Sequence, residues 1–283
     1  SYLPDYVAEK TAGRIQAQAV ERFTLSDIRG GSLDRLLALG HNVSCAVDGE
    51  TQADLDQFAQ DILTAAAQGK RFLFRSAASI LTALAALPPQ PIDATHMSRY
   101  VRDGVPGAII VGSHVKKTTQ QLEQLLQESG VTGIEVNVAE LRDGGPDAHS
   151  QILSDILMQV AAVHRSGQVP AVYTSRQELR FDTVQARLDF GIEVSSLLMD
   201  VVKGLPSDIG FLISKGGITS NDTLSTGLAL RTARLLGQIL PGVSVVRTPT
   251  DHAQFPDLPV VLFPGNVGDK AALAIAYQRL MGL

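Results

Sequence analysis

The sequence lacks the features that would tie the chain to a disulfide framework, a membrane or a nucleic acid. Cys45 is its sole cysteine, so no intramolecular disulfide can form, which agrees with a reducing cytoplasm. No apolar run is long enough to cross a bilayer, and the opening residues do not follow the pattern of a signal peptide. The net charge is −5 with Lys and Arg scattered, so a nucleic-acid footprint is absent. We therefore expect a cytoplasmic protein with small-molecule partners.

No transition-metal site or hydrolase triad is indicated either. The six histidines and the single cysteine form no cluster with the spacing of metal ligands. No serine and histidine can be paired as nucleophile and base from the sequence.

What is present is a chain of 283 residues, 45% of them hydrophobic, which can bury substantial cores. The prolines and glycines of residues 87–106 interrupt all hydrophobic periodicity. This break predicts two domains, 1–104 and 105–283, with a cleft between them. A long ordered loop within one larger domain is the alternative interpretation.

Strand and helix patterns alternate along most of the chain. In the N-terminal part we expect a helix over residues 1–17, a short helix over 33–39, a helix capped by Thr51, and strands over 19–25, 43–47 and 71–74. In the C-terminal part the expected strands are 108–111, 133–138, 169–173, 209–213, 244–247 and 260–263. The expected helices are one capped by Thr118, then 152–163, 182–202, 225–240 and a C-terminal one. The prediction is an α/β fold of two domains, each a largely parallel sheet flanked by helices.

Two glycine turns follow apolar strands in the C-terminal part. The first is Gly216-Gly217-Ile218-Thr219-Ser220, and the second is Gly265-Asn266-Val267-Gly268. Glycine lets backbone N–H groups approach a ligand closely, and N–H groups after a strand favour phosphate. Together with the turns at Gly112-Ser113 and at 174–176, they predict a nucleotide or sugar-phosphate site at one sheet edge. Ordinary strand-to-helix turns are the alternative interpretation.

The order and spacing of these motifs resemble the four-carbon acid-sugar kinases. Members of that family carry a strand followed by a Gly-Ser turn, a G-G-x-T-S turn and a G-N-x-G loop in a C-terminal nucleotide-binding domain. The first hundred residues resemble the latter part of the family's sugar-binding domain, at Glu9-Lys10-Thr11 and at 71–75. The resemblance implies ATP, with Mg²⁺, as cofactor, an acid sugar as substrate, and leaves a homodimer open. It places nucleotide contacts at Ser113, Gly216, Gly217, Ile218, Thr219, Gly265, Asn266 and Gly268.

The sequence departs from the family pattern at several positions. The acidic D-D-x-T-G-A segment, which opens the family's sugar-binding domain and serves substrate binding and catalysis, is absent from the sequence as given. Phe263 and Pro264 stand where many members have lysine and serine, and Val115 replaces a second serine. We therefore expect the nucleotide-binding part of a kinase that phosphorylates a tetronate-type hydroxy acid, incomplete for sugar turnover as given. The alternative is a non-catalytic nucleotide or sugar-phosphate binding module that acts with another chain.

Four further side chains have both a ligand-binding and a structural interpretation. Lys215 could reach a phosphate or lie solvated at its strand end. Arg176 could bind a phosphate or the substrate's carboxylate, or form a structural ion pair. Asp222 and Asp269 could position Mg²⁺ through waters, or cap helices. The catalytic residues are not identified by the sequence.

Overall fold

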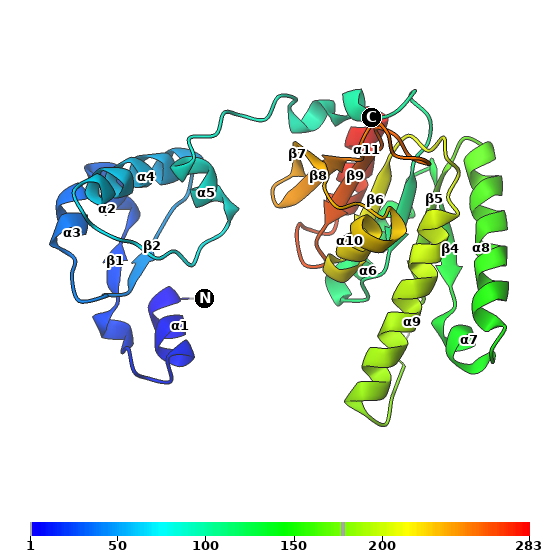
Figure 1. The fold of residues 1–283 in the computed structure, drawn as a ribbon, viewed down its shortest axis with the longest axis horizontal. Helices are drawn as coiled ribbons and strands as arrows, with labels where there is room; N and C mark the ends of the chain where they lie inside the picture. Colours follow the sequence, from blue (N-terminus) through cyan, green and yellow to red (C-terminus); the bar gives the residue numbers. More distant parts are fainter. Residues whose placement is uncertain (1, 177–178) are drawn as a thin grey trace. The chain divides into compact units, whose positions relative to one another are not determined.

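The computed structural model describes residues 2–176 and 179–283 and divides the chain into two compact units, Ser1–Pro89 and Gln90–Leu283 (Figure 1). Among the described residues, no helix combines the length and the apolar character needed to cross a membrane. Each unit is described by itself below.

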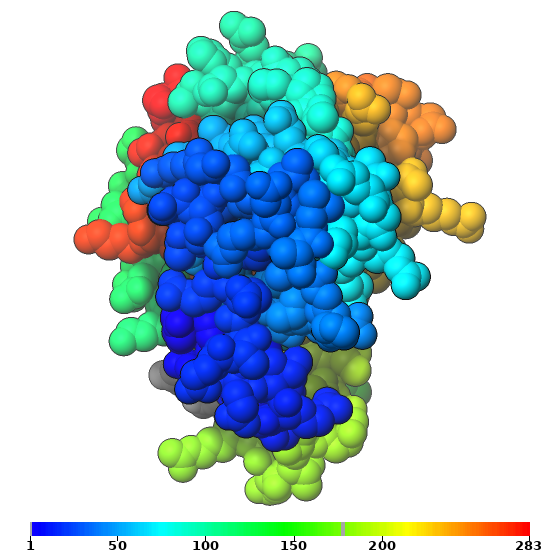
Figure 2. Space-filling model, turned by 90° about the vertical axis from the view of Figure 1, so that its left-hand side faces the viewer, coloured from blue at the N-terminus to red at the C-terminus, as the bar shows by residue number. Residues whose placement is uncertain are grey.

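The N-terminal unit is mainly helical around a small two-stranded sheet. The strands β1 (Glu21–Phe23) and β2 (Cys45–Val47) pair in parallel. Around them lie α1 (Leu3–Lys10), the 3₁₀ turn η1 (Ala17–Ala19), α2 (Leu25–Gly30), α3 (Leu33–Ala38), α4 (Gln52–Ala67) and α5 (Ala78–Leu84). The core is one cluster that includes Phe23, Leu36 and Phe58. One face of this unit, blue to cyan, is toward the viewer in Figure 2.

Helix α4 begins as its sequence predicts. Thr51 and Asp54 form a capping box, in which each side chain bonds to the other residue's backbone N–H. Arg29 donates from Nε to Asp54 at 2.8 Å and from a terminal nitrogen to Glu50 at 2.9 Å. The Arg29 guanidinium and the backbone N–H of Thr51 hold the pKa of the Asp54 carboxyl well below its usual range.

The C-terminal unit is built on a seven-stranded sheet with the order β4-β5-β3-β6-β9-β8-β7. The pairings from β4 to β9 are parallel, whereas β8 pairs antiparallel with both of its neighbours. The strands are β3 (Ala108–Val111), β4 (Val131–Val136), β5 (Val169–Thr174), β6 (Leu212–Lys215), β7 (Arg234–Leu240), β8 (Val243–Arg247) and β9 (Pro259–Phe263). The α/β class with a large, mostly parallel sheet is confirmed.

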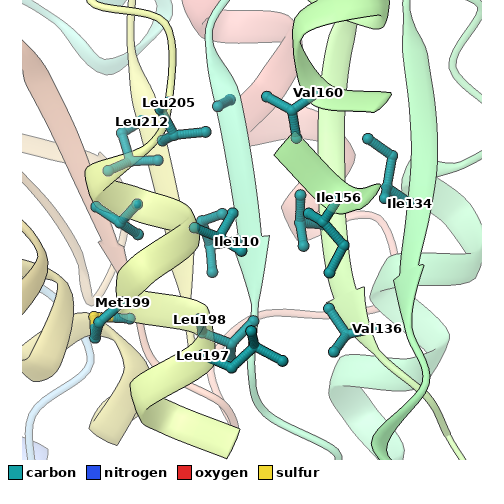
Figure 3. Close-up of a cluster of buried hydrophobic side chains, with 14 of the residues drawn as sticks. Ile110, Ile134, Val136, Ile156, Val160, Leu197, Leu198, Met199, Leu205 and Leu212 are labelled. Atoms are coloured by element: carbon teal, nitrogen blue, oxygen red, sulfur yellow. The ribbon is translucent and has the colours of Figure 1, made fainter. Parts of the chain in front are cut away.

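Helices cover both faces of this sheet. On one face, α7 (Val138–Asp143), α8 (Ala148–Arg165) and α9 (Val184–Lys203) pack against Ile110, Ile134 and Leu212 (Figure 3). On the other, α6 (Lys116–Leu125), α11 (Ala272–Met281) and the 3₁₀ segment η2 (Ala94–Tyr100) pack against alternate residues of the same strands, such as Ile109 and Ile213. Burial on both faces explains why the parallel strands read as continuous apolar runs.

Three sequence-based predictions of secondary structure are wrong. Residues 71–74 form no strand, and Leu73 is fully exposed. In place of a helix over 225–240, the chain makes a π turn η3 (Thr223–Gly227) and then strand β7. Thr118 does not cap α6, because that helix begins at Lys116 and Thr118 lies buried within it.

The boundary between the units lies between Pro89 and Gln90, not between residues 104 and 105. The Gln90 side chain donates to the carbonyl of Gln238 at 3.2 Å and accepts from its N–H at 2.8 Å, at the edge of β7. Met97 of η2 is completely buried in the core shared with α11. Residues 90–104 therefore belong with the C-terminal unit, although their sequence shows no regular periodicity.

Candidate functional site

Four turns follow four neighbouring strands at the carboxyl-end edge of the large sheet. They come after β5 (174–176), β3 (112–113), β6 (216–220) and β9 (264–269), which are adjacent in the sheet order. Ligands of open α/β sheets bind beyond this edge. The structure thus brings together the four turns that the sequence marked separately.

The turn after β6 fits tightly against the turn after β3. Gly216 has φ +129°, and a Cβ at this position would lie 2.9 Å from Thr219 Oγ1 and 3.1 Å from Ser113 Cβ. A Cβ at Gly112 would collide with the same Thr219 hydroxyl. Thr219 is 7% exposed. Glycines at 112 and 216 therefore allow Thr219 to close the space between the two strand ends.

The loop after β9, residues 264–269, is held by buried side chains from elsewhere. The Thr118 hydroxyl donates to the Gly265 carbonyl at 3.0 Å. Gln121 Nε2 donates to two further carbonyls of the loop, of Val267 at 2.9 Å and of Asp269 at 2.7 Å. Thr118 and Gln121 both have no exposed surface. The loop carbonyls are thus turned toward the protein interior.

The N–H groups of the same loop differ from its carbonyls. Those of Gly265, Asn266 and Gly268 find no acceptor within residues 2–176 and 179–283. Beside the turn after β6, the N–H groups of Gly217 and Ile218 also have no acceptor in the described part of the chain. Clusters of backbone N–H groups of this kind bind anions.

A shallow hollow of about 320 Å³ adjoins these N–H groups. Its lining residues are Gly217, Ser220, Asn221, Leu224, Leu262 and Pro264. A Cβ at Gly217 would meet nothing within 4 Å, so this glycine borders open space. Leucine and proline side chains give the hollow an apolar surface beside a polar rim, the usual character of a small-ligand site.

Lys215 lies completely buried at the end of β6. Its Nζ donates to the Pro264 carbonyl at 2.6 Å and lies 4.1 Å from the centre of the Phe263 ring. Burial, together with the positive charge of the nearby Lys117, lowers the pKa of its ammonium to about 8. Of its two predicted readings, the solvated strand-end lysine is wrong.

The guanidinium of Arg176 donates hydrogen bonds mainly to backbone carbonyls. Nε and one terminal nitrogen bond to the Thr174 carbonyl, and the other terminal nitrogen donates to the Ser113 carbonyl at 2.7 Å. Burial lowers the pKa of its guanidinium. Arg176 thus joins the turns after β3 and β5, and substrate binding by it stays a prediction.

The remaining predicted residues are exposed or make local hydrogen bonds. Ile218 is 77% exposed, and Asn266 is exposed at the loop tip. Asp222 accepts a 2.5 Å hydrogen bond from Ser195, and Asp269 accepts from the N–H of Ala271 at 3.0 Å. Both carboxylates thus accept hydrogen bonds from the protein itself. In the part of the chain that the structure describes, no three His, Cys, Asp or Glu residues are grouped to hold a metal.

Sequence reasoning assigned no function to four residues of the site: Thr118, Gln121, Leu224 and Leu262. Thr118 and Gln121 act on a loop nearly 150 residues away, at separations of 147 and 146 residues, so no local pattern reveals them. Leu224 and Leu262 look like core residues in sequence, and only the topology places them in the lining of the hollow.

Family models match both units. The nucleotide-binding C-terminal domain matches residues 108–273, and the sugar-binding N-terminal domain matches residues 1–84. The chain belongs to the four-carbon acid-sugar kinase family. The first of these models alone spans more than half of the chain, and its residues include all four turns of the site.

Two solved structures are similar to the chain at low identity. A Salmonella typhimurium LT2 protein, named as a candidate tRNA synthase, is 18% identical with a TM-score of 0.54, over 93% of this chain and 61% of that one. A domain of unknown function from Bordetella bronchiseptica, a domain-swapped dimer with bound citrate, gives 16% identity and a TM-score of 0.47, over 94% and 60%. The fold comparison rests on the Salmonella structure. The chain spans about three fifths of the length of these proteins. No curated protein matches the chain.

Proposed function

We propose that the C-terminal unit binds ATP at the carboxyl-end edge of its sheet. The observation that carries this proposal is the loop after β9, whose carbonyls are bound by buried side chains while the N–H groups of Gly265, Asn266 and Gly268 find no acceptor among the described residues. A loop fixed in this way offers N–H groups to phosphate without first having to reorganise.

The hollow beside Gly217 and Pro264 suits the other end of the nucleotide. Its Leu224 and Leu262 side chains offer apolar surface to a base, and its volume of about 320 Å³ lies at the small end of ligand sites. Phosphates would bind over the two glycine turns, and the base would lie in this hollow. Mg²⁺ would then be held mainly by phosphate oxygens and water, as is common for this ion.

As a kinase, the protein would transfer the γ-phosphate of ATP to a tetronate-type hydroxy acid held by the N-terminal unit. Such catalysis consists mostly of positioning and charge neutralisation. A non-catalytic binding module that acts with another chain is the second candidate. It is favoured by Asp222 and Asp269, each of which accepts a hydrogen bond from a nearby part of the protein.

Calorimetric titration of the full chain with ATP, with and without Mg²⁺, tests nucleotide binding. Gly217→Val should keep the fold, because its Cβ meets nothing within 4 Å, but should weaken ATP binding about tenfold or more by filling the ligand's space. Gly30→Val, at an equally open helical position at the end of α2 in the N-terminal unit, is the matched control and should bind normally. Absence of both heat and thermal shift at millimolar ATP would exclude the site.

A coupled assay for ADP release then separates the two candidates. Release that depends on a tetronate or 3-oxo-tetronate would support the kinase. ATP binding without any sugar-dependent release, at all candidate acids, would support the binding module.

A further inference from the structure

Lys215 occupies the point where three of the four turns meet. Its own carbonyl accepts the N–H groups of Gly112 and Ser113, at 3.2 and 3.3 Å. Its ammonium binds the Pro264 carbonyl at 2.6 Å, and the next two residues are the glycines of the turn after β6. One residue therefore connects the turns after β3, β6 and β9.

A buried lysine here calls for an explanation beyond the stability of the fold. Removing an ammonium from water costs free energy, and Nζ has only one carbonyl and the face of the Phe263 ring as partners among the described residues. No carboxylate lies within ion-pairing distance of it in residues 2–176 and 179–283. The positive charge lies instead against the Pro264 carbonyl of a loop whose Gly265, Asn266 and Gly268 N–H groups find no acceptor in the described part of the chain.

We propose that Lys215 is the positioning residue of the loop after β9, and that its ammonium form is the one that shapes this loop for a nucleotide phosphate. This inference rests on the proposed function. A charged donor makes a bond to the Pro264 carbonyl about twice as strong as a neutral amine would make. It also adds a positive charge near the phosphates in a partly desolvated place.

Few other ionisable groups surround this ammonium. The neighbouring strands β3 and β9 carry none, and Asp222, the last residue of the short helix α10 (Gly217–Asp222), accepts a hydrogen bond from Ser195. The adjoining turns bring His114, Arg176 and Asp269, and α6 brings Lys116 and Lys117, of which Lys117 lowers the pKa of Lys215.

The sign of the pH effect follows from the lowered pKa of Lys215. The free protein loses this proton as the pH rises through about 8, whereas a bound phosphate favours the charged form and retains the proton to higher pH. ATP affinity should therefore fall above pH 8. The free energy of unfolding of the free protein should change in the opposite direction. Between pH 8 and about 10.5 the lysine of the unfolded chain keeps its proton, whereas that of the folded chain has lost it. Because the unfolded state then binds more protons, the free energy of unfolding should rise with pH in this window.

The test is ATP titration of the full chain by calorimetry at pH 7.5, 8.5 and 9.5, where the terminal phosphate is already ionised. Wild-type affinity should fall about 5- to 25-fold across this range. Lys215→Met should bind weakly with a nearly flat profile. Lys117→Met should shift the fall to higher pH, because it removes a neighbouring positive charge that lowers the pKa of Lys215.

Controls and contrary outcomes keep the two proposals separable. Lys116→Met, at an exposed lysine on the same helix, and His114→Gln should both retain the wild-type pH profile. A wild-type affinity that does not change with pH, or a Lys117→Met profile identical to wild type, would overturn the role of Lys215 and leave ATP binding intact. Absence of ATP binding at pH 7.5 would overturn the proposed function itself. Should Lys215→Met fail to fold, the wild-type, Lys116 and Lys117 profiles still decide.

Discussion

The two glycine turns of the site are held in different ways. The turn after β6 is fixed by its own tight fit, since Gly112 and Gly216 leave room only for the Thr219 side chain. The loop after β9 is fixed by donors from outside it, namely Thr118, Gln121 and Lys215. A substitution within the turn after β6 should therefore reduce both stability and ATP binding. The conformation of the loop after β9 should instead depend on side chains that lie outside the loop.

The largest effect is expected at Gly216. Gly216→Ala would force a side chain into a φ of +129° and to 2.9 Å from Thr219 Oγ1. We expect a loss of about 2–3 kcal/mol in the free energy of unfolding, together with loss of ATP binding. Urea unfolding followed by circular dichroism measures it, and the transition that ATP shifts identifies the C-terminal unit. A variant as stable as wild type would show that the fit is looser than described.

A smaller effect is expected when the loop after β9 loses a remote donor. Gln121→Leu removes the bonds to Val267 and Asp269 and leaves two carbonyls without that partner. We expect about 1–2 kcal/mol of lost stability. The decline in ATP affinity should exceed that of Gln120→Leu, an exposed neighbour on α6. Equal affinities of the two variants would count against control of the loop from α6.

The smallest effect is expected at Thr118. Thr118→Val keeps the shape of the side chain and removes its hydrogen bonds to the Gly265 carbonyl, at 3.0 Å, and to the Ser113 hydroxyl, at 3.1 Å. The half-buried Ser113 hydroxyl can bond to water instead, so stability should fall by about 1 kcal/mol, the contribution of one neutral hydrogen bond, and ATP affinity by severalfold at most. The same unfolding and titration measurements apply. A larger loss than for Gln121→Leu would reverse the order of importance of the two donors.

The same contrast explains which parts were predictable from sequence. The strand, the glycine pair and the turn after β6 are local features, and the sequence predicted them as an apolar run followed by Gly216-Gly217. The sequence predicts Thr118 as a helix cap because threonine favours helix starts. In the structure its buried hydroxyl donates to the Gly265 carbonyl, and only the tertiary structure brings these two residues together.

The helix predicted over 225–240 failed for a related reason. Its leucines fit a helical period, but Gly237 has φ +146° and the segment pairs antiparallel with β8 through two irregular steps in register. Pairing with a neighbouring strand overrode the local pattern. Residues 71–74 failed in the opposite sense, since their strand-like sequence has no partner strand among the described residues.

The side chain of Gln90 has a practical consequence for how the C-terminal unit can be cut out and studied. By donating to and accepting from Gln238, it imitates one residue of an additional strand along β7, the outermost strand of the sheet. Unpaired strand edges are templates for aggregation between molecules. A fragment that starts at residue 105 would strip this cover and the buried Met97 from the unit, whereas one that starts at or before Gln90 keeps both.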